Sequence, residues 1–295
     1  MTPVFARTAA PRLDPRIPVL VRPSGTLQLG WDPERALLLR PPRGVTAAAL
    51  SALLRLLDGR HSRSDIVWQA NTLGIDTADI AQILAELEEA AVLTSTPRRT
   101  LVRSVHLHGR GPLSDGIAAA LADGRVRLSR TAPGELGERR RLPSADCIVL
   151  ADELVPDPRL VAELVAEGIA HLQVRLRDGR GVVGPLVLPG RTSCLRCADL
   201  TRTELDGDWP HLAAQLLGAV GHAGPDTVLA TTGLALAQLD ALIGGDPTRA
   251  PASLDATLEL DLAVPRLVRR RWHPHPNCVC RGRTSDVGES QDRQP

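Results

Sequence analysis

Two short cysteine-bearing stretches decide how this chain is interpreted. Residues 189–197 read PGRTSCLRC, and far along the chain residues 277–280 read NCVC. Each stretch turns two thiolates toward one point, so together they predict a tetrahedral four-thiolate zinc site. Four thiolates leave no open position for water or substrate, and we therefore expect the ion to be structural. The predicted ligands are Cys194, Cys197, Cys278 and Cys280.

The same cysteines leave open two alternatives, a disulfide pair and a redox dithiol. Residues 1–12 hold no continuous apolar core, and the most apolar run, residues 228–239, is too short to span a bilayer. We therefore expect a cytoplasmic protein with reduced thiols, which argues against disulfides. A thioredoxin-like context for a redox pair is missing. His273 and His275 lie close to the second stretch, but four thiols complete the site and we interpret both as bystanders.

The overall composition excludes several classes of function. The 295 residues are 43% hydrophobic and 23% charged with a net charge of +1, which indicates a globular chain of two domains and favours neither nucleic acid nor membrane as a partner. There is no tyrosine and only one phenylalanine, so platforms for stacking bases are lacking. All 35 basic residues are arginine. A mechanism that needs a lysine ammonium, such as the phosphate-binding lysine of nucleotide sites, is therefore excluded.

The N-terminal part predicts three short strands followed by three helices. The strands are expected over residues 17–22, 26–31 and 35–40. The helices are expected to start at N-caps Thr46, Ser62 or Ser64, and Thr77. On the third helix one face is apolar, through Ile80, Ile83, Leu84, Leu87 and Ala91. This order predicts a compact winged-helix-like module.

A winged helix first suggests DNA binding, but the second and third helices here are acidic and lack the basic face that contacts phosphates. If the third strand lies at an edge, its free backbone groups are suited to pairing with an extended peptide beside the third helix. The alternative is an ordinary core strand next to a solvated acidic helix face. The candidate peptide-binding residues are Leu37, Leu38, Leu39, Arg40, Ile83 and Leu87.

A first family resemblance follows from this order of elements and from the turn Leu57-Asp58-Gly59 before the second helix. Together they make residues 13–94 similar to a PqqD-like RiPP recognition element. That small domain holds the leader of a ribosomally made precursor peptide. The resemblance implies that the module binds a leader peptide.

The next part predicts a Rossmann-like α/β sheet. Strands are expected over residues 102–107, 126–129, 146–151 and 171–176, with helices over 115–121 and 160–167. The first turn carries Gly109 and Gly111, but Ser114 replaces the third glycine and Pro112 removes a backbone N–H. No acidic residue ends the second strand to hold a ribose. We interpret the loop as a degenerate nucleotide site and expect no ATP binding.

Residues after the first cysteine pair continue the alternation of helices and strands. Helices are expected over residues 209–217 and 225–243, the second of which is rich in small apolar residues that suit burial against the sheet or a second subunit. Residues 254–262 alternate like an edge strand. Residues 283–295 are polar, and we expect them to be disordered.

A second resemblance rests on residues 184–190, GPLVLPG, together with CLRCADL at 194–200 and CVC at 278–280. They make residues 100–282 similar to the ThiF/MoeB adenylyltransferase superfamily, and most similar to the ThiF-like, leader-binding partner proteins of azole-forming peptide pathways. Proteins of that kind fuse a PqqD-like module to a ThiF-like domain in the order seen here.

The two resemblances imply a non-catalytic scaffold that presents a precursor peptide to a separate YcaO-type cyclodehydratase. Active members of the superfamily adenylate a carboxylate with a glycine loop, an acidic ribose ligand and Arg and Lys contacts, and this chain departs from that set. Its one spare cysteine, Cys147, lies in an apolar strand where an inert thiol is expected. The rivals are a divergent adenylyltransferase with Arg in place of Lys, and a DNA-binding protein. A homodimer and an orphan role also stay open.

Overall fold

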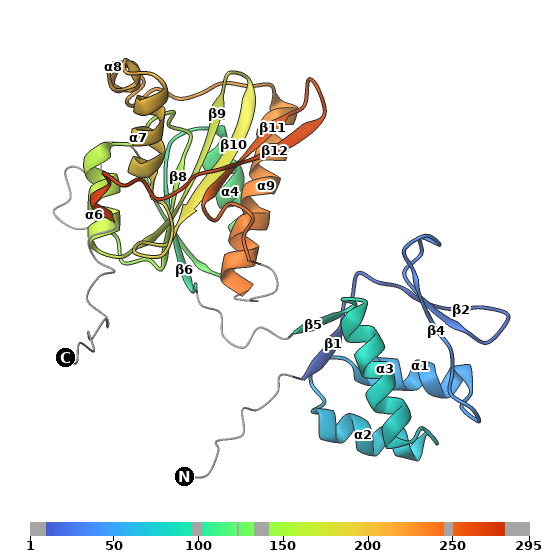
Figure 1. The fold of residues 1–295 in the computed structure, drawn as a ribbon. Helices are drawn as coiled ribbons and strands as arrows, with labels where there is room; N and C mark the ends of the chain where they lie inside the picture. Colours follow the sequence, from blue (N-terminus) through green and yellow to red (C-terminus); the bar gives the residue numbers. More distant parts are fainter. Residues whose placement is uncertain (1–9, 96–101, 123, 133–141, 245–249, 281–295) are drawn as a thin grey trace, which may run out of the picture. The chain divides into compact units, whose positions relative to one another are not determined.

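The structure is a computed structural model that describes residues 10–95, 102–122, 124–132, 142–244 and 250–280. The chain divides into two compact units, residues 1–98 and 99–295, which are drawn together in Figure 1. The segment 283–295, for which we expected disorder, lies outside the described residues.

The first unit contains a three-stranded antiparallel sheet and three helices, in the order that the sequence predicts. The strands lie in the order β2-β3-β4, with bounds β2 Val19–Val21, β3 Leu27–Leu29 and β4 Leu37–Leu39. The helices are α1 Ala47–Leu56, α2 Arg63–Thr72 and α3 Thr77–Glu89. Leucines and isoleucines of the sheet and of all three helices form one core.

The helix ends show which local signals set the chain's path. Thr46 caps α1 by accepting the Ala49 N–H, and Ser62 forms a capping box with Asp65 at the start of α2. The expected cap of α3 was one residue late, because Asp76 accepts the Asp79 N–H and Thr77 is the first helical residue. Ala91 does not extend the apolar face of α3, since it lies beyond the helix at φ 53° and is exposed.

A further strand pair, which the sequence analysis did not predict, joins the two ends of this unit. Strand β1, Pro11–Leu13, pairs antiparallel with β5, Leu93–Ser95. The Leu13 N–H also donates to the Leu57 carbonyl, and the Gly59 N–H donates to the Pro11 carbonyl. The turn at residues 57–59 is therefore fixed from both sides.

Asp58 in that turn makes the stability of the first unit depend on pH in the acidic range. Its carboxylate accepts the Arg60 N–H at 2.7 Å, and this hydrogen bond lowers the pKa of Asp58 from 3.8 to about 2, with a further contribution from His61. A lowered folded-state pKa contributes stability above 3.8 that is lost as the pH falls toward about 2. We expect Asp58→Asn to lower the melting temperature at neutral pH, with the difference from wild type shrinking toward pH 2.

Thermal unfolding of both proteins across acidic pH tests this expectation. Glu89→Gln, at the exposed end of α3, serves as the matched control for loss of one carboxylate. A difference between wild type and Asp58→Asn that stays constant down to pH 2 would mean that the Asp58 charge does not contribute.

The second unit is built around a seven-stranded mixed sheet in the order β12-β11-β10-β9-β8-β6-β7. Strands β7, β6, β8 and β9 are parallel, as in a Rossmann-like sheet, and β10, β11 and β12 are antiparallel. The parallel strands are β6 Ser104–His108, β7 Arg127–Thr131, β8 Cys147–Ala151 and β9 Ala170–Arg177. The antiparallel strands are β10 Arg180–Val187, β11 Ala256–Asp261 and β12 Arg266–Arg271.

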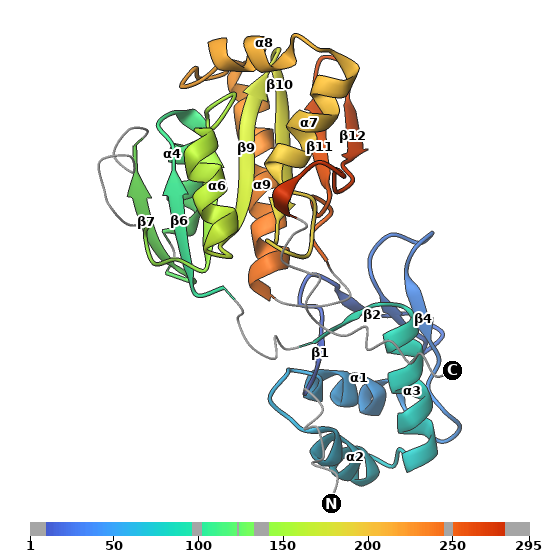
Figure 2. The ribbon, with the colours of Figure 1, turned by 60° about the vertical axis from the view of Figure 1, so that its left-hand side comes forward.

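Helices cover both faces of this sheet (Figure 2). One face carries α4, Pro112–Leu121, and α9, Pro225–Gly244, over the larger apolar core. The other carries α6, Pro158–Ala166, and α7, Leu195–Leu205, with α8, Trp209–Gln215, next to α7. The predicted edge position of residues 254–262 was wrong, since β11 pairs on both sides and the arginine-rich β12 forms that edge.

Helix α9 is long and apolar enough, by length and composition, to cross a membrane. Within this fold it packs on the sheet through β9, β10 and β11, and Ala235 and Leu239 belong to the core. Two glycines allow it to approach closely, because a Cβ at Gly181 would lie 1.9 Å from Thr231 Oγ1 of α9 and one at Gly116 would lie 3.0 Å from Thr232 Oγ1. These contacts identify α9 as a core helix of the second unit.

Candidate functional site

The four predicted cysteine ligands converge at one end of α7. Cys194 is the N-cap residue of α7 and Cys197 lies in its first turn. The preceding loop is held by hydrogen bonds from the Leu188 N–H to Thr192 Oγ1 and from the Ser193 N–H to Asp255 Oδ1. The second pair follows β12, so β10 and β12, separated in the sheet by β11, deliver the two cysteine pairs to one place.

The sulfur geometry fits a four-coordinate metal ion. All four Sγ atoms lie within 4.8 Å of one another, and the close pairs are 3.7 Å (Cys194–Cys197), 3.5 Å (Cys194–Cys278) and 3.4 Å (Cys197–Cys280). A Zn–S bond of about 2.3 Å in a tetrahedron separates the sulfurs by roughly 3.8 Å. A disulfide needs about 2.05 Å, so all four are free thiols. The group is a candidate four-thiolate metal centre.

The thiols in this group strongly affect one another. Hydrogen bonds from the Cys194 side chain, the backbone near His275 and Cys194, and the Cys280 side chain lower the pKa of Cys197. The pKa of Cys194 is raised, because its thiol donates to Cys197 and is buried, and burial raises the pKa of Cys280 to about 12. A bound cation would supply the charge that lets these thiols ionise.

The two nearby histidines are not part of the group. His275 is buried, its Nε2 lies 2.8 Å from Glu204 Oε1, and its Nδ1 accepts the Asn277 N–H at 3.1 Å. Its carbonyl also accepts the Cys278 N–H, so His275 ties the second cysteine pair to α7 through Glu204. His273 is exposed and lies outside the cysteine cluster. Both positions agree with the bystander interpretation.

The predicted degenerate nucleotide loop lies at the start of α4, and packing explains its glycines. A Cβ at Gly109 would lie 2.5 Å from the Ala151 carbonyl oxygen, and one at Gly111 would lie 2.7 Å from the Asp152 carboxylate. Both glycines therefore allow the end of β8 to approach the loop. Ser114 is buried, and its Oγ accepts the Gly111 N–H at 3.1 Å.

Asp152, which sequence reasoning missed, fills the anion position of this loop. Its carboxylate accepts the Leu113 N–H at 2.9 Å and the Ser114 N–H at 3.2 Å. The residue is buried at φ 74°, a left-handed conformation in which a non-glycine residue is strained. A helix N-terminus normally offers these N–H groups to a phosphate. Here the chain's own carboxylate accepts them.

The candidate peptide-binding residues of the first unit divide into exposed and buried sets. Leu38 and Arg40 are exposed and Leu37 is half-buried. Leu39, Ile83 and Leu87 are buried in the core, so a peptide beside α3 would not reach their side chains in this conformation. Among the described residues β4 pairs only with β3, which leaves its other side an edge.

Cys147 lies in β8, fully buried among apolar side chains. Burial raises the pKa of its thiol to about 12, so the thiolate needed for thiol transfer is disfavoured. This environment is the one expected of an inert thiol.

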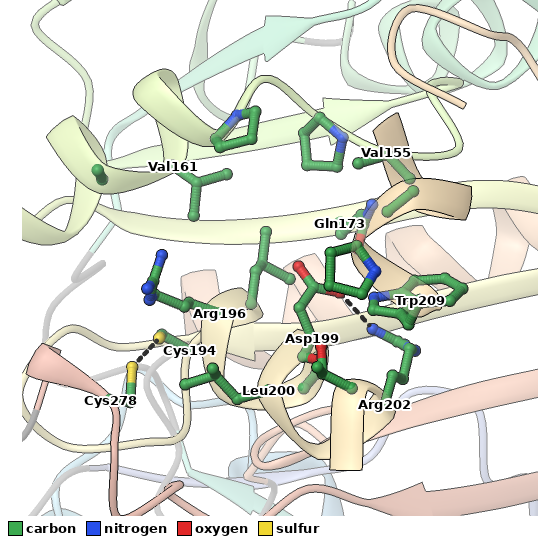
Figure 3. Close-up of a pocket in the computed structure, with 18 of the residues that line it drawn as sticks. Val155, Val161, Gln173, Cys194, Arg196, Asp199, Leu200, Arg202, Trp209 and Cys278 are labelled. Atoms are coloured by element: carbon green, nitrogen blue, oxygen red, sulfur yellow. Dashed lines mark hydrogen bonds and ion pairs between the residues drawn. The ribbon is translucent and has the colours of Figure 1, made fainter. Parts of the chain in front are cut away.

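A cavity of about 470 Å³ lies beside the cysteine group and was not predicted. Figure 3 shows Val161 of α6 and Asp199 of α7 on opposite sides of it, with Gln173 of β9 behind and Trp209 at one end. Residues of α6, α7 and α8 give it largely apolar walls. A sequence signal for the polar side of this cavity was present in β9, where polar residues alternate with apolar ones: His171, Gln173, Arg175 and Arg177.

Comparisons with known proteins show the fold. A scan against models of protein families finds no match, and neither does a search of curated proteins. Among solved structures, the heterocyclase TruD aligns over 92% of this chain and 42% of its own, with 18% identity and a TM-score of 0.62. A heterocyclase solved with substrate and cofactor aligns over 90% and 39%, with 15% identity and a TM-score of 0.60.

MccB of E. coli, solved with ATP, aligns over 92% of this chain and 99% of its own, with 12% identity and a TM-score of 0.60. A second MccB structure is that of the microcin C7 biosynthetic enzyme MccB in complex with N-formylated MccA. The chain thus spans about two fifths of the heterocyclases and nearly all of MccB. At these identities the likeness establishes the fold that they share.

Proposed function

We propose that the chain is a non-catalytic scaffold that binds the leader of a ribosomal precursor peptide and presents it to a separate cyclodehydratase of YcaO type. In this proposal the first unit is a PqqD-like recognition module and the second is a ThiF-like domain held by a structural zinc ion on Cys194, Cys197, Cys278 and Cys280. The five cysteines form no disulfide with one another, which supports a reducing, cytoplasmic location in this proposal.

The observation that carries the proposal is the state of the α4 N-terminus. Every residue from Gly111 to Asp115 has its N–H engaged within the protein or, at Pro112, has none. The acceptors are Ser114 Oγ, both oxygens of Asp152 and the Gly111 carbonyl. A phosphate would have to displace a buried carboxylate to bind here. Nucleotide chemistry therefore fits a partner enzyme better than this chain.

The solved relatives of this fold support a peptide-related role. TruD is named a heterocyclase, and MccB structures include the MccA partner. This chain corresponds to 42% of TruD, so in our proposal the rest of such a reaction comes from a separate protein.

For peptide binding we propose strand addition at the free edge of β4. The exposed Leu38 and Arg40 flank this edge, and the buried Leu39, Ile83 and Leu87 hold β4 and α3 in place from the core. Main-chain hydrogen bonds would supply the affinity, and alternate side chains of the peptide the specificity. Asp79 and Glu86, half-buried on α3, favour a peptide that carries basic groups.

Proline substitutions at adjacent positions test strand addition. In an antiparallel ladder the N–H groups of neighbouring residues point to opposite sides of the strand. Of Leu37→Pro and Leu38→Pro, we expect one to break pairing with β3 and lower stability, and the other to keep the fold and lose peptide binding. Calorimetry with synthetic extended peptides, apolar at alternate positions and with or without arginine, measures this. If the variant that keeps the fold bound the peptide as tightly as wild type, strand addition would be contradicted.

The second candidate is a divergent adenylyltransferase, favoured by the likeness to an MccB structure solved with ATP. It requires that Asp152 leave the α4 N-terminus when nucleotide binds. Pyrophosphate exchange with ATP and a peptide substrate separates it from the scaffold.

A further inference from the structure

We infer that the cavity between α6, α7 and α8 binds a ligand that has an apolar body and one carboxylate group. The cavity has a volume of about 470 Å³ and is lined by apolar groups that include Val161, Leu200, Trp209 and four prolines. It lies within the second unit, and its assignment does not rest on the proposed peptide binding by the first.

The floor of the cavity is polar in a place where a core strand is normally apolar. β9 pairs with β8 on one side and β10 on the other, and helices cover both faces of the sheet, so its side chains are buried on both faces. Leu172, Val174 and Leu176 face the core under α4 and α9. The alternate residues Gln173 and Arg175 face the cavity. Polar side chains on a buried strand face need partners.

Among the described residues, neither Gln173 nor Arg175 has hydrogen-bond partners for all of its side-chain donors. Gln173 is 2% exposed and its Nε2 has no hydrogen-bond partner, and Arg175 is 7% exposed and its Nε has none. Arg175 donates from Nη1 to the Leu154 carbonyl at 2.7 Å, but forms no ion pair with a described carboxylate. Burial and the neighbouring Arg202 and Arg177 lower the pKa of Arg175 to about 9, and the more distant carboxylates of Asp199 and Glu259 offset this only in part.

The other charges of the cavity are already compensated or exposed. Arg202 pairs with Asp199 at 2.8 Å and lies over the rings of Trp209 and Trp272. Arg196 is exposed. Arg175 is therefore the buried cation of the cavity, with Gln173 beside it as a second donor, and a carboxylate fits both.

Two sources present this chemistry, a free medium-chain carboxylic acid and the C-terminal carboxylate of an apolar peptide. The probes are sodium octanoate with octanamide as its neutral match, and an N-acetylated apolar pentapeptide with a free or amidated C-terminus. Calorimetry on the full chain measures each. We expect one of the acids to bind saturably and its amide about ten- to a hundredfold more weakly, the range that a charge-assisted hydrogen-bond pair supplies.

Variants place the effect at the floor of the cavity. Arg175→Met is expected to remove the preference for acid over amide, and Gln173→Leu to weaken acid binding a few-fold. Arg159→Met, which removes an exposed arginine of α6 that does not line the cavity, is the matched control and should bind like wild type. If Arg175→Met does not fold, Arg175→Lys keeps the charge and should retain part of the preference.

Binding by octanoate alone, or by the free-acid peptide alone, identifies the source. The assignment is overturned if wild type binds neither acid, if acid and amide bind equally, or if Arg175→Met keeps the preference. These outcomes are independent of peptide binding at β4, because the prolines there leave the cavity residues unchanged.

Discussion

Cys197→Ser is expected to lose the bound metal and to destabilise the second unit strongly. Structural zinc supplies about 10–16 kcal/mol of apparent binding free energy in small zinc-folded peptides, so we expect a loss of at least about 3 kcal/mol in this larger domain. Cys197 touches two of the other three ligands, at 3.7 Å and 3.4 Å. Its loss leaves a cluster of buried thiols that no longer closes around an ion.

Metal analysis and thermal unfolding measure this effect. Cys147→Ala is the matched control, because Cys147 is a buried cysteine outside the cluster. It should keep one zinc per chain and lose only the small stability of a core thiol. Wild-type protein without metal, or Cys197→Ser with full zinc content, would contradict the four-thiolate site.

Asp152→Ala is the second change for which we expect a large effect. It removes the acceptor of the Leu113 and Ser114 N–H groups, and two buried donors left unpaired cost about 2–4 kcal/mol. It also reopens the N-terminus of α4 to anions. We therefore expect added inorganic sulfate to stabilise Asp152→Ala more than wild type.

Thermal unfolding with and without sulfate tests this, together with two further variants. Asp152→Asn keeps one acceptor and should fall between wild type and Asp152→Ala. Asp157→Ala removes the exposed N-cap contact of α6 with the Arg159 N–H, and should lose stability without gaining a sulfate effect. An equal sulfate effect in wild type and Asp152→Ala would mean that Asp152 does not block the anion position.

Sequence patterns were informative where the determining contacts are local. The caps Thr46 and Ser62 and the apolar face of α3 lie within one or two helical turns, so the helices of the first unit were predicted close to their bounds. The cysteine pairs were also recognisable, because each pair is a short local motif. Their convergence depended on β10 and β12, which the sequence analysis had not assigned as strands.

Asp152 and Arg175 were missed for a different physical reason. The role of Asp152 depends on two N–H groups nearly forty residues earlier in the chain, and a strained φ leaves no mark in the sequence. The sequence analysis predicted a strand over residues 171–176 without placing its polar residues, because alternation shows which residues share a face but not what covers it. Only the sheet order and the helices on both faces reveal that Gln173 and Arg175 are buried.

Calorimetric titration of the zinc-loaded full chain with magnesium ATP tests the scaffold proposal most directly. Because Asp152 accepts the N–H groups that a phosphate would need, we predict no saturable heat from wild type. Saturable ATP binding by wild type, followed by pyrophosphate exchange when a peptide is added, would contradict the scaffold and assign adenylyltransferase activity to this chain.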